Sequence, residues 1–377
     1  MKGINKEGII QLLKKDSQIS YIASAMSPWH AIGVIASIKS LKLNNKRGII
    51  LIIINPTVGK AVIGEDNFNA IKDQVDIYIY DKASTRESII SLYDAFRFAF
   101  SIRNKNRDRT LHIISTQRAD MQLSGFIYRN LRNSSIHTLS YDEGLGTYFS
   151  TSLKRLFESF SLITILGFYI KNICASIHSL VHNQNHIIAN LFSYRKGVLQ
   201  ENNNIIPYYR DAIEISSSNI LVDLSMFENS IVICTTAWMR HLVKNNIDTD
   251  LVLKIVEFLS SNNIKFVIKL HPRDVWGKDI YSRYSDNIFS LSNVSTESIL
   301  ASLSVKPKAI VGFSTTALVT ANIFWNIPVI NIAEMLDKEM LSSTYKDEVT
   351  DFNRIFGPYV KSYVEFNLFA KKIKNLL

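Results

Sequence analysis

The chain has 377 residues, of which 47% are hydrophobic and 20% are charged, with two cysteines and a formal net charge of +10. This composition is typical of a soluble globular protein with two domains, and it excludes a disulfide framework or a four-cysteine zinc site. The N-terminal residues lack the apolar core of a secretory signal, and no apolar run reaches the roughly 18 residues of a membrane span. We therefore expect a cytoplasmic protein, with Cys174 and Cys234 as buried thiols.

The positive charge is unevenly distributed along the chain. Residues 1–200 contain 25 Lys and Arg against 14 Asp and Glu, whereas residues 201–377 contain 18 against 19. The basic first half would attract an anionic acceptor or the inner face of the cell membrane, where the protein would bind peripherally. A merely solubilising surface is the alternative. Nucleic acid is not an expected partner, because no DNA-binding or RNA-binding motif accompanies the charge.

The first half of the sequence alternates between apolar, β-branched runs and segments of helical length. This pattern is typical of βα units around a mostly parallel sheet. Strands are predicted at 19–24, 48–54, 75–80, 110–115 and 136–141, and helices at 29–41, 88–102 and 121–131.

A second βα series follows an apolar segment at 151–199, predicted to be helical, and a polar linker at 200–204. A C-terminal helix at 364–377 is expected to pack back across the domains. Further strands are predicted at 230–234, 264–270, 287–291, 309–312 and 328–332, and helices at 248–259, 297–303 and 315–324.

The two series predict an α/β fold of the GT-B type, in which two Rossmann-like domains, residues 1–200 and 201–377, face a central cleft. Ligands of such sheets bind beyond the carboxyl ends of the strands. No GxGxxG follows the first strand and no Walker sequence occurs, which argues against a dinucleotide oxidoreductase or a P-loop NTPase.

Three short motifs follow predicted strands. Asp142-Glu143-Gly144 places two carboxylates before a glycine that permits a tight turn. One carboxylate would act as a general base, although a solvated acidic turn is the alternative. Lys269, His271, Pro272 and Arg273 form a basic segment in which the histidine would protonate or hydrogen-bond a leaving phosphate, unless it makes only local hydrogen bonds.

The third motif, Ser314-Thr315-Thr316, precedes an apolar helix. Its hydroxyls would bind a phosphate at the helix N-terminus, with ordinary N-capping as the competing explanation. Glu297 begins another helix and would bind ribose hydroxyls or belong to the helix start. Thr235 and Thr236 follow the first strand of the second series and would approach a donor phosphate or sugar carboxylate.

The first domain offers an aromatic and a histidine after its first strand. Trp29 would stack on an acceptor sugar and His30 would hydrogen-bond to it, with Glu143 as a further acceptor contact. A role for Trp29 as core filling is the alternative.

Together the three motifs resemble those of bacterial sialyltransferases of GT-B architecture, the group that includes lipooligosaccharide sialyltransferases and capsular polysialyltransferases. The resemblance rests on Asp142-Glu143-Gly144, His271-Pro272 and Ser314-Thr315, in that order and at similar separation. It departs from the family pattern at the third motif, where Ser-Thr replaces Ser-Ser and Thr316 adds another hydroxyl.

The resemblance implies an inverting transfer of sialic acid from CMP-sialic acid to a hydroxyl of a lipooligosaccharide or capsular glycan. The resemblance also implies that Asp142 is the general base and that His271 assists the departure of CMP. Ser314 and Thr315 would bind the phosphate, and Glu297 would be a ribose ligand. No metal and no cofactor would be required, because the donor has a single phosphate. The oligomeric state stays open.

Three alternatives are left open by the sequence. The first is a polysialyltransferase that extends a sialic acid polymer. The second is a GT-B transferase or epimerase that uses another sugar nucleotide, such as CMP-Kdo or a UDP-sugar. A non-enzymatic carbohydrate-binding protein of a polysaccharide assembly complex is the third.

Overall fold

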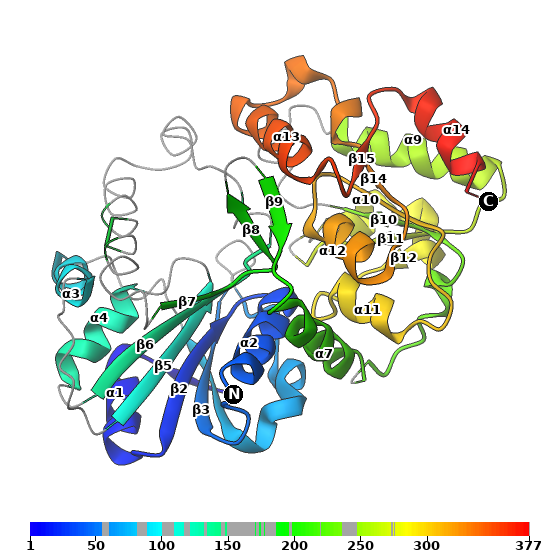
Figure 1. Cartoon of the computed structure of the whole chain (residues 1–377). Coiled ribbons are helices and arrows are strands. Elements are labelled where there is room, and N and C mark those ends of the chain that lie inside the picture. The colour runs from blue at the N-terminus through cyan, green and yellow to red at the C-terminus, as the bar shows by residue number, and fades with distance from the viewer. Residues whose placement is uncertain are drawn as a thin grey trace. The chain divides into compact units, whose positions relative to one another are not determined.

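The chain folds into two compact units, each with its own sheet (Figure 1). Unit 1 contains Met1–Glu143, Leu156–Ser193 and Glu201–Ser216; unit 2 contains Gly144–Arg155, Tyr194–Gln200 and Ser217–Leu377. The chain thus passes between the units repeatedly, whereas the sequence predicts one boundary after residue 200. The computed structural model describes residues 1–54, 60–80, 89–99, 109–116, 121–131, 134–144, 148, 170, 173–174, 177, 186–195, 198–218, 220–235, 247–272, 274 and 276–376.

The strands of unit 1 form a parallel sheet in the order β1-β4-β3-β2-β5-β6-β7. From β4 to β7 this is the Rossmann order, so the winding direction reverses between β2 and β5. β3 reads as a continuous apolar run because Ile49 to Ile52 are buried on both faces of the sheet. The strands are β1 (Lys2–Ile4), β2 (Ile19–Ala25), β3 (Arg47–Ile53), β4 (Val75–Tyr80), β5 (Arg109–Thr116), β6 (Ser134–Tyr141) and β7 (His186–Ala189).

Helices cover both faces of this sheet. α1, α3 and α4 lie on one face, and α2 with the 3-10 segment η1 lies on the other (Figure 1). α1 turns Ile9, Ile10 and Leu13 into the core, which explains its amphipathic sequence. The elements are α1 (Lys6–Lys15), α2 (Pro28–Ser40), η1 (Glu65–Gln74), α3 (Ile89–Ala99), α4 (Met121–Asn130) and α7 (Ile206–Ser217). The sequence analysis predicts neither α1 nor α7.

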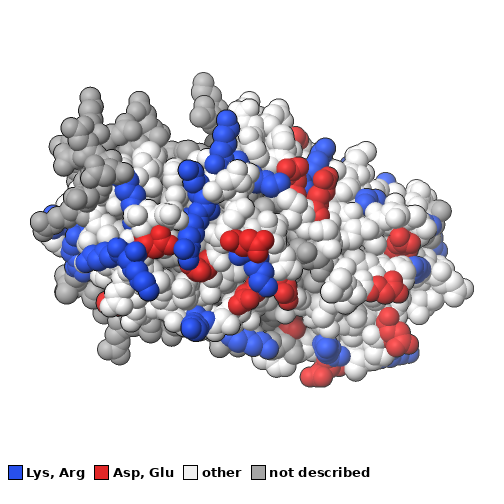
Figure 2. Space-filling view, turned by 90° about the horizontal axis from the view of Figure 1, so that it is seen from below, with Lys and Arg blue, Asp and Glu red and all other residues white. Residues whose placement is uncertain are grey.

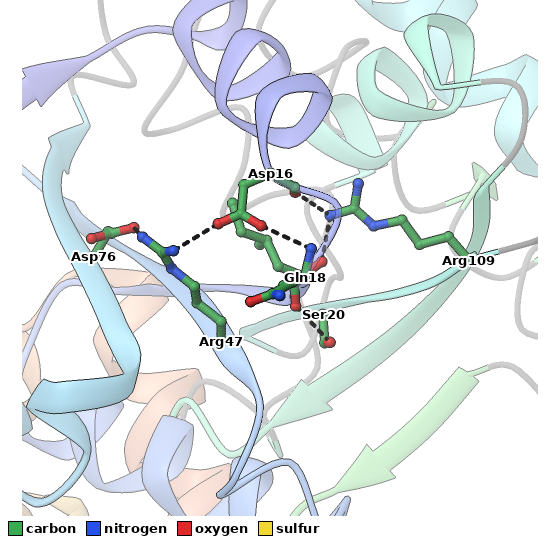
Figure 3. A network of polar contacts seen from close by, with 7 residues as sticks. Asp16, Gln18, Ser20, Arg47, Asp76 and Arg109 are labelled. Atoms are coloured by element: carbon green, nitrogen blue, oxygen red, sulfur yellow. Dashed lines mark hydrogen bonds and ion pairs between the residues drawn. The ribbon is translucent and has the colours of Figure 1, made fainter.

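Two arginines tie the end of α1 to the amino ends of four strands, β2, β3, β4 and β5 (Figure 3). Arg109 of β5 donates hydrogen bonds to the carbonyls of Leu13 and Asp16, at 2.8 and 3.2 Å, and to that of Ile19. Arg47 of β3 pairs with Asp16 at 2.8 Å and with Asp76 of β4 at 3.1 Å. The guanidinium donors thereby satisfy carbonyls that the end of α1 leaves without helical partners.

The strands of unit 2 form a second parallel sheet in the Rossmann order β12-β11-β10-β13-β14-β15. Its reversal point lies between β10 and β13. The strands are β10 (Ile231–Cys234), β11 (Phe266–Lys269), β12 (Ile288–Phe289), β13 (Ala309–Gly312), β14 (Val329–Asn331) and β15 (Lys361–Ser362).

Helices α9, α13 and α14 contribute to a large core on one face of this sheet, and α11 and α12 pack together. Phe366 and Phe369 of α14 contact Phe258 of α9, with ring centroids 5.8 and 6.5 Å apart. α14 is thus a core helix of unit 2. The helices are α9 (Ile247–Ser261), α10 (Gly277–Ile280), α11 (Thr296–Ser302), α12 (Thr316–Trp325), α13 (Ser343–Phe356) and α14 (Phe366–Lys374), with 3-10 segments η3 (Ser225–Phe227), η4 (Ser282–Asn287), η5 (Ala333–Met335) and η6 (Lys338–Met340).

The predicted helical segment 151–199 contains strands near its end. β7 joins the sheet of unit 1, and β8 (Phe192–Arg195) pairs with β9 (Val198–Glu201) in a separate ribbon. The helical prediction is therefore wrong for 186–195 and 198–199, and the predicted linker at 200–204 begins within β9. Residues 151–169 lie outside the described part of the chain.

No helix among the described residues is long and apolar enough to cross a membrane. Figure 2 shows a face on which Lys and Arg side chains lie among Asp and Glu side chains. This face therefore carries charges of both signs.

His112 and His137 face each other across β5 and β6. They are directly paired in the register of the strands, with ring centroids 5.3 Å apart. Burial, and to a smaller extent the charge of His137, lowers the pKa of His112 to about 4. The folded protein therefore disfavours a proton at this site.

This pair predicts a loss of stability in mild acid. Below the ordinary histidine pKa of 6.5, His112 binds a proton in the unfolded chain but stays neutral in the folded protein. Protonation therefore favours the unfolded chain, and the stability present above pH 6.5 is lost as the pH falls towards 4. The loss is about 2 kcal/mol at about pH 5. The free energy of unfolding of His112→Phe, measured with denaturant, should fall less between about pH 7.5 and pH 5 than that of the unsubstituted protein. Equal falls in both proteins would contradict this assignment.

Candidate functional site

Asp142 lies directly beyond the carboxyl end of β6 and is only 1% exposed. Its Oδ2 accepts a hydrogen bond from the Leu191 N–H at 3.1 Å, and its own N–H donates to Tyr209 Oη at 3.0 Å. Tyr209 in turn donates to the carbonyl of Ala189 at 3.3 Å. The aspartate is thus fixed by the end of β7 and by α7, two elements that follow it at a distance in the chain.

Tyr141, the last residue of β6, anchors the same loop from the other side. Its hydroxyl donates to the carbonyl of Ser24 at 2.6 Å, and its ring lies across α2 at Gly33. A Cβ at Gly33 would come within 2.5 Å of the ring, so only glycine permits this approach. Burial, and then the charge of Glu143, holds the pKa of Tyr141 well above its ordinary value, so the hydroxyl stays a donor.

The three residues predicted to bind the acceptor sugar differ in their exposure to solvent. Trp29 is 8% exposed, and its ring lies 5.4 Å from that of Tyr209. His30 is also buried, and its Nδ1 accepts from the Met26 N–H at 3.4 Å. In this structure both side chains are core residues, which agrees with the alternative considered for Trp29. Glu143 is exposed.

In unit 2 the strand register brings the other motifs to one edge. Cys234 at the end of β10 is level with Lys269 of β11 on one side and with Gly312 of β13 on the other. His271 and Ser314 each follow two residues later, so they lie beyond the carboxyl edge with β10 between their strands. The two motifs thus lie at the same edge of the sheet of unit 2.

Thr235 links the end of β10 to the histidine loop. Its hydroxyl accepts from the His271 N–H at 3.0 Å and donates to Asp274 Oδ2 at 3.2 Å. This bond fixes the backbone of His271, and Pro272 follows at once. Of the remaining predicted residues here, Thr236 and Arg273 lie outside the described part of the chain.

Two buried ionisable residues lie behind this edge. Lys269 and Glu297 are each 4% exposed. Burial lowers the pKa of Lys269, while Cys234 and Glu297 oppose this shift. Glu297 Oε1 accepts from the Thr320 hydroxyl at 2.7 Å, which ties α11 to α12. In this structure both charged residues are therefore part of the framework beneath the edge.

The hydroxyl motif departs from ordinary capping. Thr315 is the N-cap residue of α12, yet among the described residues its side chain makes no capping hydrogen bond. The N-cap serines of α2, α11 and α13, in contrast, accept from backbone N–H groups at 3.2, 2.9 and 3.2 Å. The capping hydrogen bond expected of Thr315 under the alternative explanation is therefore not made within the described part of the chain. Ser314 has a left-handed backbone, with φ of 41°.

Gly144, the third residue of the acidic motif, belongs to unit 2 and lies beside the hydroxyl motif. Its φ is 98°, and a Cβ at this position would lie 2.6 Å from Thr316 Oγ1. A side chain is thus excluded by conformation and by space. Gly144 and Thr316, about 170 residues apart in the sequence, therefore lie side by side within unit 2.

Sequence reasoning missed three residues that hold the site. These residues accept hydrogen bonds from the Asp142 N–H, the Thr235 hydroxyl and the Ser314 N–H, and they are Tyr209, Asp274 and Asn331 respectively. Asn331 had a detectable signal, because it is a polar residue at the end of the apolar run of β14. Among the described residues no group of three or more His, Cys, Asp or Glu could hold a metal ion; metal independence remains a prediction.

Comparison with known proteins supplies the family. The sequence matches the family model described as Alpha-2,8-polysialyltransferase (POLYST) over residues 21–334, which include all three motifs. No curated protein matches the sequence. An alpha/beta-galactoside alpha-2,3-sialyltransferase from the luminous marine bacterium Photobacterium phosphoreum is 13% identical, with 91% of this chain and 97% of that chain covered and a TM-score of 0.41.

The UDP-GlcNAc 2-epimerase of Methanocaldococcus jannaschii, solved with UDP-GlcNAc and UDP, is 10% identical, with 95% and 92% covered and a TM-score of 0.50. This likeness shows the fold alone, two Rossmann-like sheets as in GT-B glycosyltransferases. The family model spans most of the sequence, so the chain belongs to the alpha-2,8-polysialyltransferase family and is a glycosyltransferase that depends on CMP-sialic acid.

Proposed function

We propose that this protein transfers sialic acid from CMP-sialic acid to a hydroxyl of a sialylated cell-surface glycan, by a single inverting displacement that needs no metal. The observation that carries the proposal is the meeting of Gly144 with Thr316, which supports a common role for the acidic and hydroxyl motifs. The family match supports the donor and an acceptor that already ends in sialic acid.

Asp142 is proposed as the general base. As the acceptor oxygen attacks the anomeric carbon of sialic acid, its proton passes to the Asp142 carboxylate. One oxygen of this carboxylate is held by the Leu191 N–H, and the preceding backbone is held by Tyr209. Such fixed hydrogen bonds support proton transfer because they keep the base in one orientation. Glu143, which is exposed, is proposed to contact the acceptor.

The donor phosphate is assigned to unit 2. As the bond from the anomeric carbon to the phosphate oxygen breaks, negative charge develops on CMP, and His271 would donate a proton or a hydrogen bond to it. The hydroxyls of Ser314, Thr315 and Thr316, and the N-terminus of α12, would hold the phosphate. Thr235 supports this arrangement because it fixes the backbone of His271. A single phosphate is satisfied by these groups without a cation.

The carboxylate of Glu297 remains our proposed ribose ligand, although it accepts from Thr320 in this structure. Lys269 is proposed to act from beneath, as a buried positive charge that favours an anionic donor. The excess of basic residues in residues 1–200 supports an anionic acceptor and peripheral contact with an anionic membrane.

The reaction is tested by release of CMP. Purified protein should release CMP from CMP-sialic acid when an oligosialic acid acceptor is added, and EDTA should leave the rate unchanged. CMP-Kdo and UDP-sugars serve as donor controls, and neutral galactosides as acceptor controls. No release with any acceptor, or abolition of release by EDTA that zinc or magnesium restores, would contradict the proposed reaction.

The two acidic residues should separate by kinetics. Asp142→Asn keeps the shape but removes the base, so kcat should fall by about a thousandfold while the affinity for CMP is kept. Glu143→Gln should retain most of kcat and raise the KM of the acceptor. CMP affinity is measured by calorimetry. Unchanged kcat in Asp142→Asn would remove this residue from the base role.

The contact of Gly144 with Thr316 predicts a steric defect. Gly144→Ala adds a Cβ against Thr316 Oγ1 and forces alanine into a left-handed conformation, so kcat/KM for the donor should fall by about tenfold or more. Gly64→Ala is the matched control, because a Cβ there meets nothing within 4 Å. If the two variants have equal kcat/KM, the meeting of the two motifs has no role in catalysis.

A further inference from the structure

Asn331 is a fully buried polar residue next to the hydroxyl motif. It ends β14 and is level with Gly312 of β13. Its Oδ1 accepts hydrogen bonds from the N–H of Ser314 at 2.9 Å and from the N–H of Ala333 at 3.2 Å. The Ser314 hydroxyl lies 3.5 Å from the same oxygen. One amide oxygen therefore holds both the backbone and the side chain of the first hydroxyl residue.

The other end of the Asn331 side chain is held equally firmly. Its Nδ2 donates to Asn353 Oδ1 of α13 at 3.3 Å and to Ser362 Oγ of β15 at 3.1 Å. Ser362 also donates to Asn353 Oδ1. Because donors face one end of the amide and acceptors face the other, the side chain has one orientation in which every bond is made.

Ser314 needs such support because its backbone is left-handed. A non-glycine residue with φ of 41° is disfavoured, and it persists only where its surroundings hold it. The bond from its N–H to Asn331 supplies this hold. The backbone N–H of Ser314 is thereby directed to Asn331.

We infer that Asn331 is a positioning residue for the donor phosphate. It keeps Ser314 in the left-handed conformation that sets the direction of Thr315 and of the N-terminus of α12. The inference rests on the proposed function, since it assigns the phosphate of CMP-sialic acid to this loop. Asn331 touches neither donor nor acceptor in this role and acts through Ser314.

The test separates positioning from general stability. Asn331→Ala should raise the KM of CMP-sialic acid and the Kd of CMP by about tenfold, and leave the acceptor KM within about twofold. Asn287→Ala is the matched control. Asn287 donates to the carbonyl of Phe266 at the amino end of β11, so its loss should lower Tm without changing the donor KM.

A second variant tests whether Asn331 acts by holding Ser314 in its left-handed conformation. Ser314→Gly accepts a positive φ without strain, so adding Asn331→Ala to it should raise the donor KM by less than about threefold. This pair also covers the case in which Asn331→Ala alone fails to fold. Equal penalties in both backgrounds, or parallel rises in donor and acceptor KM, would overturn the inference.

The two proposals fail in different ways. Wild-type protein that turns over CMP-sialic acid, with donor kinetics insensitive to Asn331→Ala, would overturn the positioning role alone. Wild-type protein that neither turns over CMP-sialic acid nor binds CMP would overturn both.

Discussion

Parallel pairing of β10 with both β11 and β13 is the constraint on which the proposed donor site depends. Each of these strands has four buried residues, and their last residues are level. Polar side chains can therefore gather only beyond that edge, because the strands themselves are covered on both faces. The position of His271 relative to Ser314 follows from this register and needs no direct bond between them.

The architecture and the three motifs could be predicted because their signals are local. Runs such as Ile49 to Ile54 have no alternation, which indicates buried parallel strands. The strands of 186–201 escaped prediction because they are short and follow an apolar segment that resembles a helix. The burial of Trp29 could not be predicted, because a tryptophan at a helix start has the same sequence signal in a core as in a sugar site.

The supporting residues were harder to predict than the residues they support. Tyr209 reaches Asp142 from 67 positions away, and Asn331 reaches Ser314 from the end of another strand. Such bonds are set by which strands are neighbours, and a single sequence does not record this order. The capping role weighed for Thr315 could be decided only by geometry, since a capping and a non-capping hydroxyl have the same sequence context.

The repeated passage of the chain between the units limits how the protein can be divided. α7 belongs mainly to unit 1, although it follows β9 and directly precedes the sequence of unit 2. A fragment that starts at residue 201 would carry α7 away with the sheet of unit 2, and a fragment that ends at residue 200 would leave the Asp142 amide without the Tyr209 hydroxyl. Separately expressed halves would thus complement each other only by exchanging a helix. The two units are therefore expected to fold correctly only as parts of one chain.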